Sequence, residues 1–320
     1  MKPFVYITRK LPEEIIQPLQ DNFDVEMWYK EDEPVPREVL LNKVEKASAL
    51  LTMLSEKVDS ELLERGKQLK IIANMAVGYD NIDLNVAEEK GVLITNTPDV
   101  LTETTADLAF SLILMTARRT IEAASMIQDG KWTSWAPRLL AGVDVHHKTI
   151  GIYGMGKIGQ AVAHRARGFH MRVLYHNRKR LIKVEQDLGA TYVSFQQLLS
   201  QSDFVVCLAP LTAETKGIFG IQEFKQMKSS GIFINAARGA IVKEVDLIEA
   251  LKQREIAGAG LDVFEKEPID SDNQLLTFPN VVSLPHIGSA TEETRRKMMS
   301  LCVQNIEAVL TGNKPITLVR

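Results

Sequence analysis

The chain has 320 residues, which is long for a single hydrophobic core and predicts two domains with a ligand cleft between them. Its composition is 45% hydrophobic and 25% charged, with a formal net charge of −3, so it is typical of a globular protein rather than a disordered one. A chain without a basic excess is not expected to bind nucleic acid or an anionic membrane.

The chain carries no predicted targeting or membrane-spanning segment. The apolar run near the N-terminus, Phe4–Thr8, is too short for a signal peptide, and no later run approaches the ~18 apolar residues of a membrane span. Cys207 and Cys302 lie in apolar stretches without paired or metal-type spacing. We therefore expect two buried thiols, no metal site and a cytoplasmic location.

Short apolar runs alternate with segments of helical spacing over the first hundred residues. The apolar runs are Phe4–Thr8, Ala49–Leu54, Leu69–Ala73 and Val92–Thr95, and the helical segments include Pro36–Lys46 and Asp59–Lys67. This alternation predicts parallel strands covered by helices. A long amphipathic helix is then expected over Thr104–Arg119, followed by a polar segment that contains tryptophan and extends to Lys148.

A second alternation begins at Thr149 and continues nearly to the end of the chain. Its expected strands are Thr149–Tyr153, Met171–Tyr175, Asp203–Ala209, Gly231–Asn235, Ala257–Val263 and Asn280–Leu284. Six strands with intervening helices predict a doubly wound parallel sheet. Ser289, with Glu292 three residues later, predicts a capping box at the start of a last helix. That helix is expected to reach about Leu310 and to pack on the first domain.

A glycine-rich turn follows the first strand of this second alternation. The turn reads Gly154-Met155-Gly156-Lys157-Ile158-Gly159, and helical spacing continues after it. In a GxGxxG turn the first glycine permits the tight bend, the second lets the backbone approach a pyrophosphate, and the third lets helix and strand pack closely. The helix N-terminus offers free N–H groups to the negative charge. A strand before the motif and a helix after it favour a dinucleotide site over a glycine turn without a ligand.

The end of the next strand predicts which dinucleotide is bound. An enzyme that uses NAD usually has an acidic residue about twenty positions after the glycines, to hold the ribose hydroxyls. Here the strand ends in His176-Asn177-Arg178-Lys179-Arg180, without an acid. Asn177, Arg178 and Arg180 could surround a 2′-phosphate through charge-assisted hydrogen bonds, which favours NADPH over NADH. The alternative is a solvated basic start of a helix.

Three polar residues follow later strands of the same domain, where open α/β sheets bind their ligands. Arg238 could hold a substrate carboxylate, and His286 could give and regain a proton near neutral pH. Glu267 would orient the imidazole and favour its protonated form. Taken singly, each residue also has a structural interpretation: a turn arginine, a glutamate that ends a strand, and a structural histidine. The pattern alone leaves both interpretations open.

The motifs together resemble those of a known family. Besides the glycine turn, they are Asn-Ala-Ala-Arg-Gly at 235–239, Gly-Leu-Asp-Val-Phe-Glu at 260–265 leading to Glu267-Pro268, and Pro-His-Ile-Gly-Ser at 285–289. In this order they resemble the D-isomer-specific 2-hydroxyacid dehydrogenases, within them the branch of glyoxylate/hydroxypyruvate reductases and 2-ketogluconate reductases. The resemblance extends over nearly the whole chain and implies that Arg238, Glu267 and His286 form the catalytic trio.

The resemblance also implies further site residues. The segment 73–80 resembles the substrate loop of the family, so the N–H groups of Val77 and Gly78 would receive the substrate carboxylate. Asp262 would contact the nicotinamide amide. The remaining residues implied at the cofactor or substrate are Thr105, Pro210, Ala236, Gly288 and Ser289, and Met53, Leu54 and Met75 would form apolar walls. Trp132 and Trp135 resemble a dimer arm, although two partly buried aromatic residues beneath a loop are the alternative.

The resemblance and the chain order combine into one expectation. We expect an α/β protein with two Rossmann-like, doubly wound parallel-sheet domains. A dinucleotide-binding domain (100–287) would be inserted in a discontinuous, flavodoxin-like substrate-binding domain (1–99 plus 288–320). The expected activity is NADPH-dependent reduction of glyoxylate, hydroxypyruvate or 2-ketogluconate by a homodimer. The alternatives are a nicotinamide-sensing, corepressor-like interaction protein and an NAD-dependent enzyme such as a phosphoglycerate dehydrogenase.

Overall fold

The computed structural model describes residues 2–319 and divides the chain into two compact units. The first unit consists of Met1–Leu101 together with Ala290–Arg320, and the second unit is the continuous segment Thr102–Ser289. The first unit is therefore discontinuous in sequence. Each unit has its own parallel sheet.

The first unit has a five-stranded parallel sheet in the order β2-β1-β3-β4-β5. This is the flavodoxin-like strand order. Its elements are β1 (Phe4–Ile7), α1 (Glu13–Asn22), β2 (Asp24–Met27), α2 (Arg37–Val44), β3 (Ala49–Thr52), α3 (Ser60–Arg65), β4 (Ile71–Asn74), α4 (Leu84–Glu89), β5 (Leu93–Thr95) and α12 (Glu292–Leu310).

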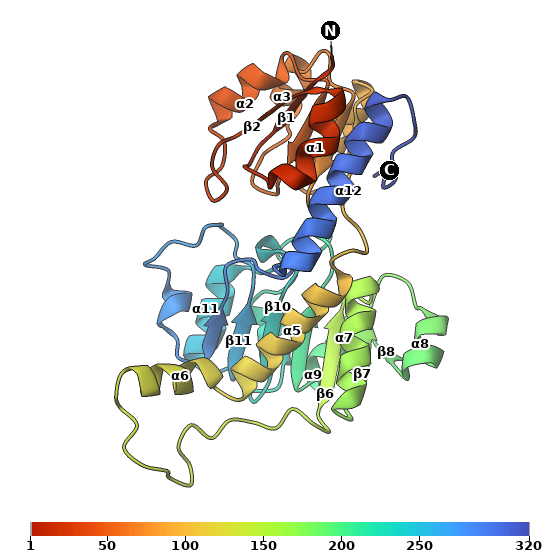
Figure 1. The fold of residues 1–320 in the computed structure, drawn as a ribbon. Coiled ribbons are helices and arrows are strands. Elements are labelled where there is room, and N and C mark those ends of the chain that lie inside the picture. The colour runs from red at the N-terminus through yellow and green to blue at the C-terminus, as the bar shows by residue number, and fades with distance from the viewer. Residues whose placement is uncertain (1, 320) are drawn as a thin grey trace. The chain divides into compact units, whose positions relative to one another are not determined.

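The strands of this sheet are apolar on both faces because helices cover both. Tyr6, Leu50, Ile72 and Ile94 belong to one buried cluster with side chains of α2, α3 and α4. The opposite face is covered by α1 and α12, which lie side by side although they come from opposite ends of the chain (Figure 1). The expectation that the last helix packs on the first domain is thus confirmed.

The second unit has a seven-stranded parallel sheet in the order β12-β11-β10-β9-β6-β7-β8. This is the doubly wound dinucleotide-binding order with one added strand. The elements are α5 (Thr102–Ala117), α6 (Thr120–Gln128), β6 (Thr149–Tyr153), α7 (Lys157–Gly168), β7 (Arg172–His176), α8 (Ile182–Leu188), β8 (Thr191–Tyr192), α9 (Phe195–Gln201), β9 (Phe204–Cys207), α10 (Ile221–Gln226), β10 (Ile232–Asn235), the 3-10 helix η1 (Gly239–Ile241), α11 (Glu244–Gln253), β11 (Gly258–Leu261), the 3-10 helix η2 (Gln274–Thr277) and β12 (Val281–Ser283).

Successive residues of these strands are buried on opposite faces of the sheet. Phe204 and Val206 of β9 pack with α5 and α7 on the face seen at the front of Figure 1. Val205 and Cys207 of the same strand pack with α9, α10 and α11 on the other face. A strand buried on both faces reads as a continuous apolar run, which is why the sequence reveals these strands. The predicted fold class, two doubly wound parallel-sheet domains, is confirmed.

The structure corrects three details of the sequence analysis. The edge strands β2 and β8 were not predicted, because β2 alternates exposed and half-buried residues and β8 has only two residues. Ser289 does not cap the last helix. Thr291 is the N-cap, and its side chain accepts a hydrogen bond from the N–H of Thr294.

Both cysteine side chains are buried, as expected, and both thiols are reduced. Burial raises the pKa of Cys207 to about 12 and also raises the pKa of Cys302. No helix within residues 2–319 has both the length and the apolar character to span a membrane.

Candidate active site

The glycine turn connects β6 to α7, and its three glycines have different surroundings. Gly154 has a φ of 103°, and a Cβ there would lie 2.5 Å from the backbone nitrogen of Ala209. A Cβ on Gly159 would overlap the carbonyl oxygen of Gly154. In contrast, a Cβ on Gly156 would meet nothing within 4 Å. The fold therefore requires glycine at positions 154 and 159, whereas Gly156 leaves open space where a ligand could approach the backbone.

The start of α7 is suited to a negatively charged ligand. Gly156 is the N-cap residue and offers no side chain to the first N–H groups of the helix. These groups and the helix dipole favour an anion. Lys157 is exposed in the first turn. The residues present thus fit the pyrophosphate of a dinucleotide.

The residues after β7 extend this site, and the structure separates their roles. The Oδ1 atom of Asn177 accepts a hydrogen bond of 3.0 Å from the N–H of Met155, so Asn177 lies against the glycine turn. Arg178 is exposed. The pKa of Glu214 is lowered mainly by the hydrogen bond from Thr212, and the charge of Arg178 lowers it further. Arg180 instead forms two hydrogen bonds with Glu185, of 2.8 and 2.7 Å.

His286 and Glu267 form a close pair at the ends of β12 and β11. The distance between His286 Nδ1 and Glu267 Oε2 is 2.7 Å, and the two side chains are 30% and 36% exposed. Burial is the largest single influence and would raise the pKa of Glu267, but the lowering influences together outweigh it, first among them the hydrogen bond from His286 and the charge of its ring, so the pKa lies below its ordinary value. The N–H of Phe264 and the charge of Arg238 act in the same direction. With Nδ1 held, Nε2 is the ring atom that can exchange a proton with a substrate.

The backbone around His286 is held in an uncommon conformation by Asp262. His286 has a φ of 54°, and its N–H donates to the carbonyl oxygen of Asp262. The carboxylate of Asp262 accepts hydrogen bonds from the N–H groups of Ile287, at 2.7 Å, and Gly288, at 2.8 Å. Burial raises the pKa of Asp262 to about 6, against the lowering effect of these bonds. Asp262 therefore fixes the loop that presents the imidazole.

Arg238 lies in a turn that is braced on both sides. Asn235 is buried at the end of β10, donates to the carbonyl oxygen of Arg238 and accepts from the N–H of Ala237. A Cβ on Gly239 would overlap the backbone of Phe264, so the Arg238 turn packs directly against the loop that carries Glu267. The structure thus brings the three predicted catalytic residues together.

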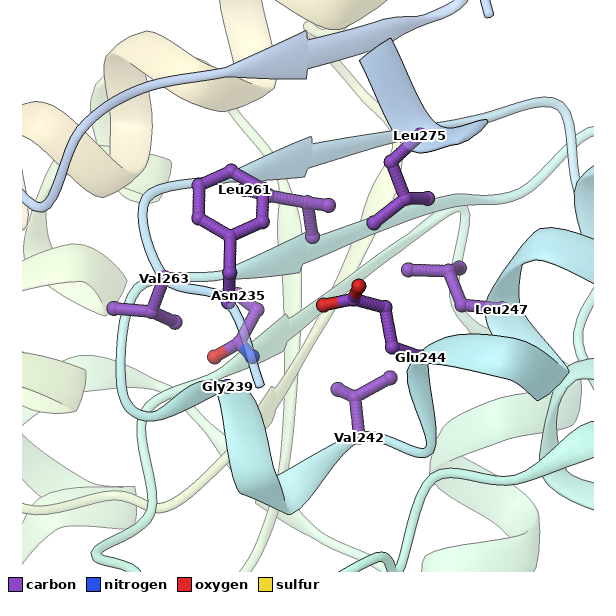
Figure 2. A pocket seen from close by; sticks show the side chains of 9 residues that line it. Asn235, Gly239, Val242, Glu244, Leu247, Leu261, Val263 and Leu275 are labelled. Atoms are coloured by element: carbon purple, nitrogen blue, oxygen red, sulfur yellow. The ribbon is translucent and has the colours of Figure 1, made fainter. Parts of the chain in front are cut away.

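A small cavity separates this turn from α11, and Figure 2 shows Glu244 projecting into it. Its volume is about 10 Å³, which holds one water at most, so it cannot be the substrate site. Glu244 accepts hydrogen bonds from the N–H of Glu265 and from the side chain of Asn273. These contacts hold both ends of the loop that contains Glu267.

Five other predicted residues lie along the same edge of the second unit. A Cβ on Gly288 would be 3.1 Å from Asp262 Oδ2 and 3.4 Å from Thr105 Cγ2, so these three residues are neighbours. Pro210 follows Ala209, which contacts Gly154. Ala236 directly follows β10, and its N–H bonds to the carbonyl oxygen of Cys207. Ser289 follows Gly288 and is half-buried.

The predicted substrate loop lies in the first unit, after β4. Asn74 donates to the carbonyl oxygen of Gly78, and Asn96 donates to that of Val77. The N–H groups of Val77 and Gly78 donate to no acceptor within residues 2–319. Two adjacent free N–H groups on a braced turn can receive a carboxylate.

The residues that brace these loops were not among the predicted site residues. Asn74, Asn96, Asn235 and Glu244 hold the backbone through side-chain hydrogen bonds. The available signal was a polar residue inside or next to a buried strand, since such a residue needs a partner. Sequence alone does not identify that partner.

The predicted dimer arm is exposed. No residue of α6 is buried, and Trp132 and Trp135 are 56% and 78% exposed. This exposure is greater than the alternative, two partly buried aromatic residues beneath a loop, would give. Within the described part of the chain, no three acidic, histidine or cysteine side chains form a group that could hold a metal ion.

Comparison with known proteins gives one consistent family. Residues 110–288 match the family described as D-isomer specific 2-hydroxyacid dehydrogenase, NAD binding domain. The chain is 50% identical to a glyoxylate reductase of Thermococcus kodakarensis, over 100% of this chain and 96% of that protein. The TT0316 protein of Thermus thermophilus superposes with a TM-score of 0.93, at 41% identity over 99% of this chain and 100% of that one.

Some solved relatives contain ligands. One of them is an NADPH-dependent glyoxylate/hydroxypyruvate reductase of Sinorhizobium meliloti in complex with NADP and malonate. It has a TM-score of 0.86 and 31% identity, and the match covers 100% of this chain and 97% of that one.

Proposed function

Since this chain belongs to the D-isomer-specific 2-hydroxyacid dehydrogenase family, we propose that it reduces small 2-keto acids, glyoxylate first, with NADPH. The observation that carries the proposal is the pair of His286 and Glu267 beside Arg238, at the strand ends of a dinucleotide-binding sheet. The two compact units would be the substrate-binding and dinucleotide-binding domains.

Each member of the trio has one task in this reaction. The nicotinamide, when bound, supplies a hydride to C2 of the keto acid. His286 gives a proton from Nε2 to the carbonyl oxygen, and Glu267 orients the ring and balances its charge. Arg238 binds the substrate carboxylate and polarises the adjacent carbonyl. The product is the D-2-hydroxy acid wherever C2 becomes chiral, and in the reverse direction His286 acts as the base.

We assign the substrate carboxylate also to the N–H groups of Val77 and Gly78. Both groups are free of protein acceptors within the described residues, and both belong to a turn held by Asn74 and Asn96. Ser289 would contribute a hydroxyl to the same substrate.

The dinucleotide would lie on the glycine turn, where Gly156 leaves open space. Residues proposed to line it are Thr105, Gly154, Met155, Gly156, Lys157, Ile158, Gly159, Pro210, Ala236, Asp262 and Gly288. The 2′-phosphate of NADPH would be held by Asn177, Arg178 and Arg180. Because Arg180 is already bound by Glu185, we expect Arg178 to contribute more. The NADP complex of the Sinorhizobium relative supports this preference.

A substrate panel tests the proposal. Glyoxylate, hydroxypyruvate and 2-ketogluconate are supplied with NADPH and, in parallel, with NADH, and loss of the nicotinamide absorbance is followed. We expect turnover of glyoxylate with NADPH, and slower turnover with NADH. Tight binding of NADPH without turnover of any of the three acids would contradict an enzymatic role and would favour a protein that senses the nicotinamide.

We also propose that the enzyme is a cytoplasmic homodimer. Ile121 and Ile127 of α6 and the nearby Trp132 and Trp135 are all exposed and apolar. A group of exposed apolar side chains of this kind is typical of a surface that a partner covers. The two buried thiols suit a reducing compartment. Elution as a monomer at micromolar concentration would contradict the dimer.

A further inference from the structure

A buried ion pair in the first unit has no role in the reaction proposed above. Arg9 follows β1 and Glu56 follows β3, and Arg9 Nη1 lies 2.8 Å from Glu56 Oε1. Their side chains are only 11% and 2% exposed. Two charges that are so well buried are costly unless their polar atoms all find partners, so the hydrogen bonds of this pair matter for the fold.

Four hydrogen bonds occupy the carboxylate of Glu56. Oε2 accepts from the hydroxyl of Thr8, at 2.6 Å, and from the N–H of Met53, at 2.7 Å. Oε1 accepts from Arg9 and from the hydroxyl of Ser55, both at 2.8 Å. Arg9 also donates to Ser55 and to the carbonyl oxygen of Thr8. The segment from Met53 to Glu56 is thereby closed into a tight loop after β3.

Asn81 connects this loop to the predicted substrate turn. Its Nδ2 donates to the carbonyl oxygens of Met53 and Glu56, at 3.2 and 2.9 Å. Its side chain also contacts that of Asn74 at 3.4 Å. Asn74 in turn holds the carbonyl oxygen of Gly78. A continuous set of hydrogen bonds therefore runs from the buried ion pair to the turn at Val77 and Gly78.

We propose that Arg9 and Glu56 are positioning residues, which hold the loop 53–56 and, through Asn81 and Asn74, the turn 77–78 in the shape that binds the substrate carboxylate. The inference rests on the proposed function for the identity of the ligand. It needs no contact between the ion pair and the substrate. Since preorganised loops lower the entropic cost of binding, loosening this set should weaken substrate binding and leave dinucleotide binding unchanged.

The first experiment measures the loops without any substrate. Glu56→Gln keeps the shape of the side chain but removes the charge that Arg9 needs. Amide hydrogen exchange of the whole protein should become about tenfold faster over residues 53–58 and 74–82. The matched control is Glu26→Gln, which breaks the exposed pair of Glu26 with Lys43 in the same unit and should leave both segments unchanged. Equal exchange in the two variants would overturn the proposal.

The second experiment measures the consequence for the substrate. In Glu56→Gln the KM for glyoxylate should rise about tenfold, while the Kd for NADPH stays within about twofold of wild type. A residue that acts only on stability would lower the midpoint of thermal unfolding and leave KM unchanged in the folded enzyme, and that result would overturn the positioning role. If wild type does not turn over glyoxylate, the proposed function fails, whereas the exchange experiment still decides whether Glu56 holds the loops.

Ser55→Ala provides a milder variant in case Glu56→Gln does not fold. Ser55 is exposed, and its hydroxyl bridges Arg9 and Glu56. We expect a rise of about threefold in KM for glyoxylate with little change in unfolding temperature. A KM equal to that of wild type would contradict the role of this bridge and, with it, the proposal.

Discussion

The two units each contain a carboxylate paired with a cationic or ionisable partner, and the two pairs differ in exposure. His286 and Glu267 in the second unit are 30% and 36% exposed, and only one oxygen of Glu267 faces the imidazole. Arg9 and Glu56 in the first unit are 11% and 2% exposed, and four donors surround the carboxylate. The distances within the pairs are nearly equal, at 2.7 and 2.8 Å.

Exposure and partner chemistry therefore decide what each pair can do. An imidazole at the surface of a site can lose and regain its proton, because solvent and substrate reach it. A guanidinium does not lose its proton, and a buried carboxylate with four donors has no free lone pair for a substrate. The pair of His286 and Glu267 is therefore suited to proton transfer, and the pair of Arg9 and Glu56 is suited to holding the backbone. Substitutions in both units test this distinction.

The largest effect is expected from His286→Gln. Removal of the proton donor should lower kcat for glyoxylate reduction by about a thousandfold, since general acid catalysis contributes roughly 10²–10⁴-fold. Binding of NADPH, measured by fluorescence titration, should be nearly unchanged because the glycine turn is intact. His146→Gln alters an exposed histidine outside the site and serves as control. Full activity in His286→Gln would refute the assignment of the proton donor.

The next effect is on stability, and the two pairs should respond differently. Glu56→Gln leaves a buried guanidinium without its counter-charge and should lower the free energy of unfolding by about 3 kcal/mol. Glu267→Gln breaks a pair that is a third exposed and screened by water, and it should cost less than about 1 kcal/mol. Urea unfolding of both variants measures the difference. Equal losses would show that exposure does not separate the pairs.

A third test uses the raised pKa of Asp262, the residue that holds the His286 loop. A pKa raised to about 6 means that the folded protein binds this proton more tightly than the unfolded chain does. The resulting stabilisation is complete below the ordinary pKa and is lost as pH rises through about 6. The stability advantage of wild type over Asp262→Asn should therefore shrink by up to about 3 kcal/mol between about pH 4 and 7.

Asp203→Asn supplies a control of opposite sign for that experiment. Burial would raise the pKa of Asp203, but the hydrogen bonds from Lys228 and from the N–H of Thr149, together with the nearby lysine charges, outweigh it and the pKa is lowered. Its contribution to stability should therefore be lost as pH falls. Urea unfolding over the same pH range should show the two variants diverging from wild type in opposite directions. A parallel response of both variants would contradict the raised pKa of Asp262.

The fold could be predicted wherever a buried element appears in the sequence as an apolar run. Strands such as β9 are buried on both faces and appear as apolar runs. The edge strand β2 has exposed Asp24 and Glu26 and gives no such run, so its existence depends on pairing with β1, which local sequence does not show. The cap of α12 was misplaced by two residues because Ser289 and Thr291 are both possible caps, and only the path of the chain selects one.

The candidate site was predictable where short motifs carry the chemistry. The glycine turn and the trio of Arg238, Glu267 and His286 can be found from spacing and from the family resemblance. The buried pair of Arg9 and Glu56 could not, since the two lie 47 positions apart and each resembles an ordinary surface charge until the sheet brings them together. The pairing of Arg180 with Glu185 is local, and the proposed 2′-phosphate would have to compete with this carboxylate for the same guanidinium.

The smallest effect is expected at the proposed cofactor site, where Arg178 is exposed and Arg180 is already paired with Glu185. Arg178→Ala removes an exposed cation and should raise the Kd for NADPH about tenfold, the value of one charge-assisted hydrogen bond, with no change for NADH. Arg180→Ala removes a cation that Glu185 already neutralises and should change the Kd by less than about twofold. Titration of both variants with both cofactors makes the comparison. Equal losses for NADPH and NADH in Arg178→Ala would mean that this arginine does not bind the 2′-phosphate, and a larger loss in Arg180→Ala would mean that Glu185 releases its arginine when the dinucleotide binds.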